Sequence, residues 1–338
     1  MIVWLKFAAL AAAIGYSGYR LSVYGDIIAE KKGWGRVWLG TILMAGVTSL
    51  PELVTGISSV TAANVPDIAV GNVLGACAFN LMLISILDLL YAFSGRTSVF
   101  DFTSRGHVIS GGFAIVLLGV VALSVGLQDI WVVPSISHVG LATILLAVFY
   151  FAAVRSMFHY EKTAMADRET ALLYPEVNLA AAAWGYSANA LIVVAAGTAL
   201  PYVGKELADY HGWGTSLVGT LFIALATTLP EMVVTLGAVW LGAIDLAVGN
   251  IFGSNLFNML ILFADDLLYR PGPLLQLASQ VHMVTAILVM MMIGFALVGI
   301  ILRPRRSAVV LLSWTTLCIL LLFLLNTAIL VHVEALGG

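Results

Sequence analysis

Ten stretches of the sequence are each roughly 20 or more residues long, rich in apolar side chains and poor in charge. A helix of about 20 apolar residues crosses the hydrocarbon core of a bilayer. Hydrophobic residues make up 61% of the chain and charged residues 10%, so the chain cannot hide its apolar surface from water. We therefore predict an all-α membrane protein with ten transmembrane helices, at residues 2–24, 36–63, 67–93, 107–127, 130–153, 178–203, 213–241, 244–269, 281–302 and 308–332.

Basic residues are distributed unevenly between the two sides of this ten-helix arrangement. Twelve of the 15 Lys and Arg residues fall in or beside loops of one side, and Lys6, Lys205 and Arg270 fall on the other. Loops rich in Lys and Arg stay in the cytoplasm. The chain is therefore predicted to span a plasma or inner membrane many times, with both termini extracytoplasmic. Its first apolar stretch is too long for the core of a signal peptide and is expected to remain as a helix.

Two segments in the second half of the chain repeat two segments in the first half. Residues 40–52 match residues 219–231 at seven of 13 positions, and both copies end in Leu-Pro-Glu. Residues 67–91 match residues 245–269 at 12 of 25 positions, and both copies contain Gly-Asn followed by Phe-Asn. Unrelated apolar helices share Leu and Ala, whereas these matches include Pro, Glu and Asn. The sequence therefore indicates an internal duplication.

Each copy contains five of the ten predicted helices. Because five is an odd number, the second copy enters the membrane from the opposite side, which predicts two inverted five-helix repeats. The repeats are expected at residues 1–160 and 178–338, with a cytoplasmic linker at 161–177. Transporters built from inverted repeats bind their substrates near the middle of the bilayer, between the repeats, on interrupted helices.

The strongest candidates for such a site are Glu52 and Glu231, which lie deep in apolar segments at equivalent positions of the repeats. A carboxylate at the centre of a bilayer costs a few kcal/mol or more and usually marks an ion or proton path. Pro51 and Pro230 precede the glutamates. Each proline is expected to break its helix one turn before the glutamate, because it lacks an N–H and clashes with the carbonyl four residues earlier. Glutamates that only pack helices together are the alternative.

Hydroxyl and amide groups accompany the two carboxylates. They belong to residues in the turn before each glutamate and on the next predicted helix, namely Thr48, Ser49, Thr227, Thr228, Asn80 and Asn258. All of these ligands are oxygens, which suit Ca²⁺ with its coordination number of about 6–8, whereas Zn²⁺ and Cu²⁺ prefer His or Cys. One Ca²⁺, Na⁺ ions or protons can each neutralise two carboxylates, so competition for one site would allow exchange. Helix packing is the alternative role of the hydroxyls.

These residues resemble the motifs of the cation/Ca²⁺ exchanger superfamily, in its Na⁺/Ca²⁺ exchanger branch. The matching residues are Thr-Ser-Leu-Pro-Glu52 and Thr-Thr-Leu-Pro-Glu231, with Gly-Asn72, Phe-Asn80, Gly-Asn250 and Phe-Asn258. The resemblance implies alternating access, in which the first and sixth helices slide past a fixed core. It also implies Ca²⁺ ligands from Glu52, Glu231, Thr48, Thr227 and the carbonyls of Ala45 and Ala224, and flanking Na⁺ sites from Ser49, Thr228, Ser254, Asn80 and Asn258.

One departure from the family motif bears on which ion drives exchange. Ala76 stands where the second repeat has Ser254, so it offers no hydroxyl and one flanking Na⁺ site is expected to be impaired. Potassium-dependent members of the family carry Asp at the position of Asn258, so co-transport of K⁺ is not expected. Two functions stay open. The first hypothesis is a Na⁺/Ca²⁺ antiporter, and the second is a proton-driven exchanger of Ca²⁺ or another divalent cation.

A second pair of acidic residues recurs near the ends of equivalent segments. Asp88 and Asp266 begin the sequence Asp-Leu-Leu-Tyr in both copies. Their position favours a role in capping a helix or pairing with an interfacial Arg, and a vestibule for ions is the alternative.

An enzyme is the main alternative of another class, and a purely structural membrane protein is the remaining one. Gly15-Tyr-Ser17-Gly18 matches the Gly-x-Ser-Gly of rhomboid-type intramembrane proteases, but all six histidines lie near predicted helix ends or loops. Gly-Tyr-Ser recurs at residues 185–187, which indicates helix packing instead. We therefore expect no enzymatic activity, no resident cofactor and no nucleic-acid or protein partner. The expected ligands are the transported ions, Ca²⁺ and Na⁺ or H⁺.

Overall fold

The computed structural model of the chain describes residues 2–31, 44–94, 97–131, 134–164, 178–303 and 313–335. Within these residues, nine helical stretches are long and apolar enough to cross a membrane. They are α1 (Ile2–Lys31), α5 (Pro66–Phe93), α6 (His107–Gly126), α7 (Leu141–Ala164), α8 (Leu179–His211), the continuous run of α9 (Thr215–Leu217), η3 (Val218–Ile223) and α10 (Ala224–Trp240), α11 (Ile244–Leu268), α13 (Val281–Leu302) and α14 (Trp314–Ala335). The predicted all-α membrane fold is confirmed.

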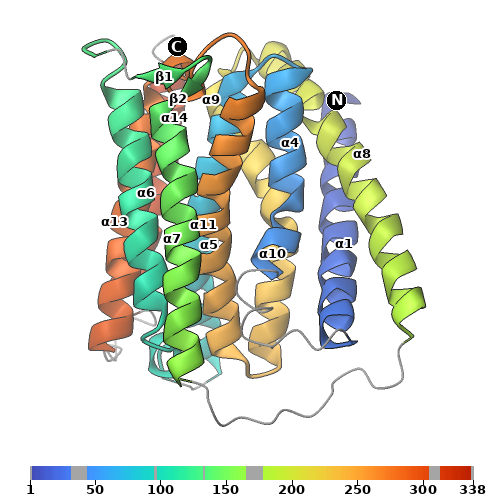
Figure 1. The fold of residues 1–338 in the computed structure, drawn as a ribbon, viewed down its shortest axis with the longest axis vertical. Coiled ribbons are helices and arrows are strands. Elements are labelled where there is room, and N and C mark those ends of the chain that lie inside the picture. The colour runs from blue at the N-terminus through green and yellow to red at the C-terminus, as the bar shows by residue number, and fades with distance from the viewer. Residues whose placement is uncertain are drawn as a thin grey trace.

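The remaining predicted crossing, at residues 36–63, is described from residue 44 onwards. It forms two helices, α3 (Met44–Thr48) and α4 (Leu50–Thr61), which are separated at Ser49. Pro51 lies in the first turn of α4, where its missing N–H costs no helical hydrogen bond. The predicted break before Glu52 is therefore present. α1 begins and α14 ends at the same end of the bundle, in agreement with an even number of crossings (Figure 1).

In the second repeat, the prediction of a helix break before Glu231 is wrong. α10 continues through Pro230 without interruption, and the irregular backbone lies further upstream, in the π-helix η3. A membrane helix can continue through a proline when neighbouring groups satisfy the freed backbone carbonyl. The irregular turn η3 packs closely against another helix. A Cβ atom on Gly71 or Gly75 of α5 would lie 2.9 Å or 2.1 Å from backbone atoms of Thr220, so η3 lies directly against the backbone of α5. Such π-helical turns occur frequently at functional sites.

Short elements occupy the connections between the long helices. The predicted crossing at residues 130–153 begins later than expected, because β1 (Ser135–Ile136) and β2 (Val139–Gly140) form an antiparallel hairpin before α7. η2 (Val99–Phe102) precedes α6, and α12 (Leu274–Leu277) precedes α13. α7 extends to Ala164, so the first residues of the expected linker are helical, and residues 165–177 lie outside the described residues.

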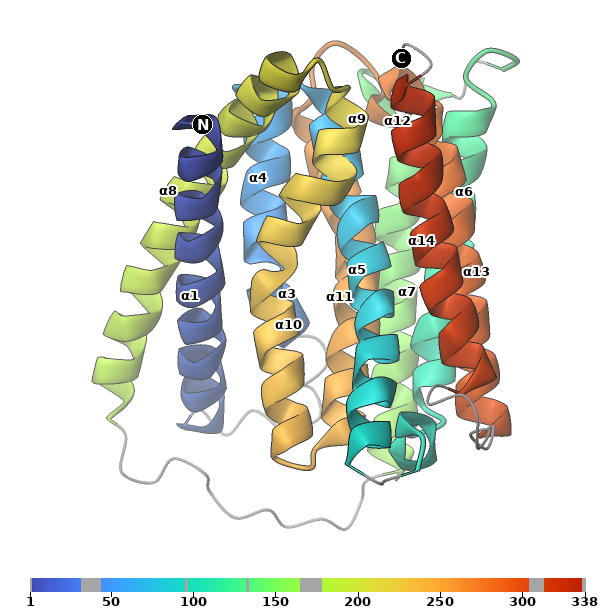
Figure 2. The same ribbon diagram turned by 180° about the vertical axis from the view of Figure 1, so that it is seen from behind.

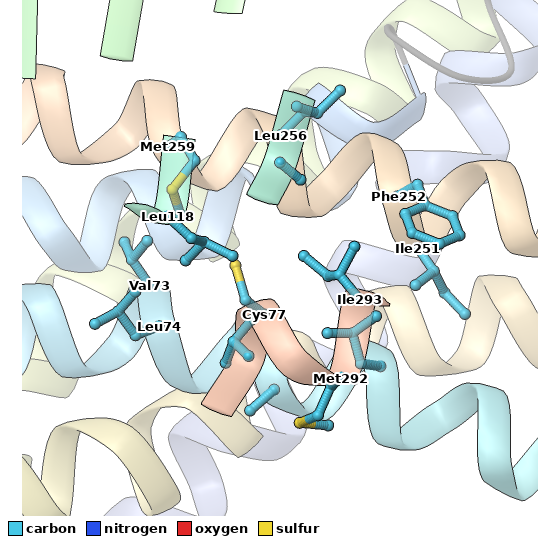
Figure 3. Packing of buried hydrophobic residues seen from close by; sticks show 14 of the residues in the cluster. Val73, Leu74, Cys77, Leu118, Ile251, Phe252, Leu256, Met259, Met292 and Ile293 are labelled. Atoms are coloured by element: carbon cyan, nitrogen blue, oxygen red, sulfur yellow. The ribbon is translucent and has the colours of Figure 1, made fainter. Parts of the chain in front are cut away.

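α5 and α11 form the centre of the bundle, and α1 and α8 lie side by side at one edge (Figures 1 and 2). In the most apolar window of each helix, 78% of the residues of α5 and α11 are buried, against 22% for α1 and 17% for α8. The main apolar core lies where α5 and α11 meet α6 and α13. Figure 3 shows part of it, with Val73, Leu74, Cys77, Leu118, Ile251, Phe252, Leu256, Met259, Met292 and Ile293.

Glycines let α1 approach its neighbours closely. A Cβ atom on Gly18 would lie 2.3 Å from Pro230 Cγ, and one on Gly15 would lie 3.2 Å from Leu229 Cβ. On α8, a Cβ atom on Gly185 would lie 2.4 Å from the ring of Tyr24. The glycines of the two Gly-Tyr-Ser sequences therefore serve helix packing, as predicted. The contact with α10 brings α1 beside the residue that directly precedes Glu231.

Candidate cation-binding site

The residues predicted for the site come together in the interior of the bundle. All eleven are at most 1% exposed: Glu52, Glu231, Thr48, Thr227, Ala45, Ala224, Ser49, Thr228, Asn80, Asn258 and Ser254. They come from α3 and the first turns of α4, from α10, and from the central helices α5 and α11. Glu52 and Glu231 lie near enough to each other for their charges to interact. The fold thus gathers two carboxylates in a space closed to solvent.

Each glutamate has a hydroxyl group of the other repeat beside it. Ser49 Oγ donates to Glu231 Oε1 at 2.9 Å, and Thr228 Oγ1 lies 3.4 Å from Glu52 Oε1. Ser49 and Thr228 hold equivalent positions, three residues before the glutamate of their own repeat. The hydroxyl that precedes one glutamate therefore serves the other glutamate. This reciprocal pairing ties the two halves of the site together.

Four oxygen atoms of the site have no hydrogen-bond partner. They are one carboxylate oxygen of each glutamate and the two amide oxygens, namely Glu52 Oε2, Glu231 Oε2, Asn80 Oδ1 and Asn258 Oδ1. Buried oxygens are almost always paired, since leaving one unpaired costs about 1–3 kcal/mol and more for a charged group. Among the described residues, no Lys or Arg side chain forms an ion pair with either glutamate. The four atoms are all electron-pair donors, so a cation, a proton or a further hydrogen-bond donor could satisfy them.

Threonine hydroxyls and backbone carbonyls line the same space, but unequally in the two repeats. Thr48 Oγ1 donates to the carbonyl of Ala45 at 3.1 Å and lies 3.4 Å from Ser254 Oγ. Thr227 Oγ1 instead donates to Asn72 Oδ1 at 2.8 Å and lies 3.2 Å from the carbonyl of Ala224. The contact of Thr48 with Ser254 has no counterpart at Thr227, because Ala76 stands at the position equivalent to Ser254 and supplies no hydroxyl.

Three further residues, which the sequence analysis did not predict as ligands, also contact residues of the site. They are Asn72, Asn255 and Cys77. Asn72 Nδ2 donates to the carbonyl of Glu52 at 3.3 Å. The amide of Asn80 donates to Asn255 Oδ1 at 3.1 Å, and the amide of Asn258 lies 3.6 Å from the sulfur of Cys77. The involvement of Cys77 and Asn255 could have been predicted from the alignment of the repeats. The two residues occupy equivalent positions between Gly-Asn and Phe-Asn.

Asp88 and Asp266 have a different role, because both of their carboxylate oxygens accept hydrogen bonds at the start of another helix. Asp88 accepts from Ser98 Oγ, Val99 N, Ser313 N and Thr316 Oγ1 at 2.8–3.1 Å. Ser313 and Thr316 lie at the start of α14, where the helix dipole favours a negative charge. Asp266 accepts from Gly140 N at 2.8 Å, from Thr143 Oγ1 and from Leu274 N at 2.6 Å, at the starts of α7 and α12.

The other ends of α5 and α11 carry a matching pair of aspartates. Asp67 accepts a hydrogen bond from Ser279 N at 2.7 Å and lies 3.1 Å from His282 Nε2, at the start of α13. Asp245 accepts from Ser104 N at 2.6 Å and lies 2.9 Å from His107 Nε2, at the start of α6. Each central helix is therefore fastened at both ends to the fourth and fifth long helices of the other repeat.

The fold defines a class, that of all-α membrane proteins built from repeats, and comparison with known proteins specifies the family. The model of the family described as "Sodium/calcium exchanger protein" matches residues 2–158 and 181–331. The chain therefore belongs to the sodium/calcium exchanger family and is an integral multi-pass membrane protein. Members of this family are transporters that exchange cations, and are not enzymes.

Individual relatives agree with this assignment. The chain is 27% identical to the inner membrane protein YrbG of Escherichia coli over 78% of both chains. It is 26% identical to the putative antiporter CaxA of Alkalimonas amylolytica over 74% of this chain and 76% of that one. Solved structures of the sodium-calcium exchanger NCX_Mj superpose with TM-scores of 0.60 and 0.61 at 18% identity, covering 97% of this chain and 98% of theirs. At that identity the superposition shows the shared fold.

Proposed function

We propose that the chain exchanges Ca²⁺ for Na⁺ by alternating access, with the ions bound between Glu52 and Glu231. The observation that carries this proposal is the set of four buried oxygens without partners on Glu52, Glu231, Asn80 and Asn258. Two of the four belong to carboxylates, so the charge of one Ca²⁺ balances the charge of the site. Mg²⁺ fits less well, because it gives up its water reluctantly and demands near-ideal octahedral geometry.

The remaining ligands of Ca²⁺ come from the turns that precede the glutamates. Thr48 and Thr227 donate their hydroxyl hydrogens to carbonyl or amide oxygens, which leaves the lone pairs of both hydroxyls free for a cation. The carbonyls of Ala45 and Ala224 lie beside these hydroxyls. Together with the carboxylates they supply the roughly 6–8 oxygens that Ca²⁺ prefers.

Exchange follows from the charge of the site. The two carboxylates are neutralised either by one Ca²⁺ or by Na⁺ ions that bind Ser49, Thr228, Ser254, Asn80 and Asn258. Holding both kinds of ion at once would leave excess positive charge in a medium of low dielectric constant, which is costly. Binding of Ca²⁺ therefore displaces Na⁺, and binding of Na⁺ displaces Ca²⁺. The number of Na⁺ ions exchanged for one Ca²⁺ depends on how much positive charge the site accepts in each state.

Movement is assigned to the pair α1 and α8. Fewer of their residues are buried than in any other long helix of the described chain. α1 lies against Leu229 and Pro230, directly before Glu231, through the bare backbone of Gly15 and Gly18. A shift of the pair along this smooth surface would uncover the glutamates toward one side of the membrane and cover them from the other.

The membrane arrangement is part of the proposal. The repeats comprise residues 1–160 and 178–338, inverted with respect to each other, with the linker of 161–177 in the cytoplasm. Both termini are extracytoplasmic, on the evidence of the Lys and Arg distribution. Labelling of single cysteines introduced at the two termini by a membrane-impermeant thiol reagent tests this, since labelling in intact cells requires the outward orientation.

A proton-driven Ca²⁺ exchanger is the second candidate, and one observation favours it. Ala76 provides no hydroxyl beside Thr227, whereas Ser254 lies 3.4 Å from Thr48. One of the flanking Na⁺ positions therefore lacks a ligand. The free carboxylate oxygens of Glu52 and Glu231 can bind protons in place of Na⁺.

Ca²⁺ flux in proteoliposomes of the purified protein decides between the two candidates. Flux driven by an imposed Na⁺ gradient and absent under a pH gradient supports Na⁺/Ca²⁺ exchange, and the opposite result supports proton coupling. No flux under either gradient contradicts the choice of Ca²⁺. Glu206→Gln is the matched control for substitutions of the two glutamates, since Glu206 is half exposed and pairs with Lys6 on the surface.

A further inference from the structure

Asp265 is a third carboxylate that lies inside the bundle without partners. Its side chain is fully buried, and neither of its oxygens has a hydrogen-bond partner. The next residue, Asp266, shows the opposite, since both of its oxygens are satisfied by donors. The equivalent position in the first repeat is Leu87, so the carboxylate of Asp265 has no counterpart there.

The carboxylate of Asp265 fills a space that a glycine leaves open. A Cβ atom on Gly56 of α4 would lie 2.4 Å from Asp265 Oδ2 and 2.7 Å from Oδ1. Gly56 follows Glu52 by four residues, about one helical turn. Asp265 follows Asn258 by seven residues, about two turns, and therefore lies on the same face of α11. Asp265 thus lies between the Glu52–Glu231 site and the membrane end at which α11 finishes.

Few charged groups surround Asp265. The next residue is the acidic Asp266, and Glu52 precedes Gly56 by one turn of α4. Asp67 lies at the start of α5, and the ring of His138 lies 3.0 Å from the carbonyl of Leu267. Among the described residues, no cationic side chain pairs with Asp265. A buried carboxylate in a membrane protein requires a positive charge or a proton, so a ligand must supply it.

We propose that Asp265 binds one monovalent cation, Na⁺ or H⁺, on the path between the Glu52–Glu231 site and the membrane face where α11 ends. A single carboxylate is neutralised by a single positive charge, whereas Ca²⁺ would leave an excess. The proposal rests on the exchange function proposed above. Asp265 would add an ion-binding position to one half of the path only, because the equivalent residue of the first repeat is Leu87.

The test compares Asp265→Asn with the wild type in Ca²⁺ binding and in flux. Equilibrium Ca²⁺ binding to purified protein should be unchanged, because the substituted side chain lies outside the Ca²⁺ site. The exchange rate should fall roughly tenfold, within the usual range of coupling between two sites. Dependence of the remaining flux on external pH is lost if the ligand is H⁺, and dependence on Na⁺ concentration is weakened if it is Na⁺.

Gly56→Ala provides an independent perturbation, because it retains the carboxylate and displaces it. The matched control is Gly237→Ala on α10, where a Cβ atom would meet nothing within 4 Å. We expect Gly56→Ala to reproduce the slow exchange and Gly237→Ala to leave it unchanged. Wild-type rate and unchanged Na⁺ and pH dependence in both Asp265→Asn and Gly56→Ala would overturn the proposal, as would loss of Ca²⁺ binding in Asp265→Asn. Absence of flux in the wild type refutes the exchange function instead.

Discussion

The carboxylates inside the bundle are of two kinds, which differ in whether their oxygens have partners. At the ends of α5 and α11, Asp88 and Asp266 have donors to both oxygens. In the middle of the bundle, Glu231 Oε1 accepts the hydroxyl hydrogen of Ser49, and Glu52 Oε1 lies 3.4 Å from the hydroxyl of Thr228. The second oxygen of each glutamate has no partner. The four residues are all buried. Burial therefore does not distinguish the two kinds, and the supply of hydrogen-bond donors does.

This difference separates carboxylates that connect structural elements from carboxylates that still need a cation or a proton to neutralise them. A carboxylate surrounded by N–H and O–H donors is stabilised in its charged form and fastens the elements that supply those donors. A carboxylate with an unpaired oxygen in a medium of low dielectric constant is unfavourable until a cation or proton arrives. The first kind fastens both ends of α5 and α11 to other helices, and the second kind marks the residues that we propose bind ions.

Removing the charge from the central pair should have the largest effect on exchange. Glu52→Gln and Glu231→Gln each leave one carboxylate, too little charge to balance Ca²⁺, so Ca²⁺ flux should fall by at least roughly 100-fold, the upper end for groups that support a bound metal. Both variants should melt no lower than the wild type, because a costly buried charge is removed. Flux measured in proteoliposomes and melting measured in detergent check the two expectations.

The matched control for these two variants is Glu206→Gln, which makes the same chemical change on the surface. Surface ion pairs contribute about 0–1 kcal/mol, so flux and melting should both stay near those of the wild type. If Glu52→Gln or Glu231→Gln transported Ca²⁺ as fast as Glu206→Gln, the central glutamates would belong to the structural kind and the site assignment would be wrong.

The same substitution at the helix ends should reverse the pattern. Asp88→Asn and Asp266→Asn each turn an amide nitrogen toward N–H and O–H donors, and unsatisfied buried groups of this sort cost about 1–3 kcal/mol. We expect the melting temperature to fall while the exchange rate of the folded fraction is retained. The measurement is melting by intrinsic fluorescence together with flux normalised to folded protein. Unchanged melting with abolished flux would instead assign these aspartates to the ion path.

A smaller effect is expected where α1, of the proposed moving pair, meets α10. Gly18→Ala places a Cβ atom 2.3 Å from Pro230 Cγ, and the proline ring cannot turn away. Overpacking of this kind costs about 1–3 kcal/mol, so exchange should slow roughly tenfold with Ca²⁺ binding retained. Gly237→Ala, with nothing within 4 Å of its Cβ atom, is the control for initial rates in proteoliposomes. Equal rates in the two variants would show that α1 does not move along α10.

The membrane fold was open to prediction because its signals are local. Long apolar stretches predict crossings without knowledge of their neighbours, and the recurrence of Pro-Glu at Glu52 and Glu231 has few explanations other than a site. Sequence periodicity does not distinguish an apolar hairpin from the start of a helix, so it does not predict the strands at residues 135–140. The predicted break at Pro230 is also wrong, and the irregular turn lies upstream, where Thr220 contacts Gly71 and Gly75. That contact joins distant parts of the chain, so the local sequence does not reveal it.

The pairing within the site depends on how the two repeats meet. The sequence places Ser49 beside Glu52, yet its hydroxyl donates to Glu231. Likewise, His282 lies far from Asp67 along the chain, and the two meet because the fourth helix of one repeat packs on the third of the other. Contacts of this kind join elements by tertiary packing, which leaves no trace in the spacing of residues. Asp265 is hidden in the sequence for the same reason, because its neighbour Gly56 lies in the other repeat.

The smallest effect concerns the difference between the two repeats. Ala76→Ser would give the first repeat the hydroxyl that Ser254 provides in the second, where it lies 3.4 Å from Thr48. One added contact of hydrogen-bond strength is worth about 1 kcal/mol, so the Na⁺ concentration for half-maximal exchange should fall roughly fivefold. Ala76 is buried, so a thermal melt should accompany the Na⁺ titration to show that the added oxygen is tolerated. Unchanged Na⁺ activation in a stable Ala76→Ser protein would mean that the missing hydroxyl does not impair a Na⁺ site, and the asymmetry between the repeats would then have no bearing on the coupling ion.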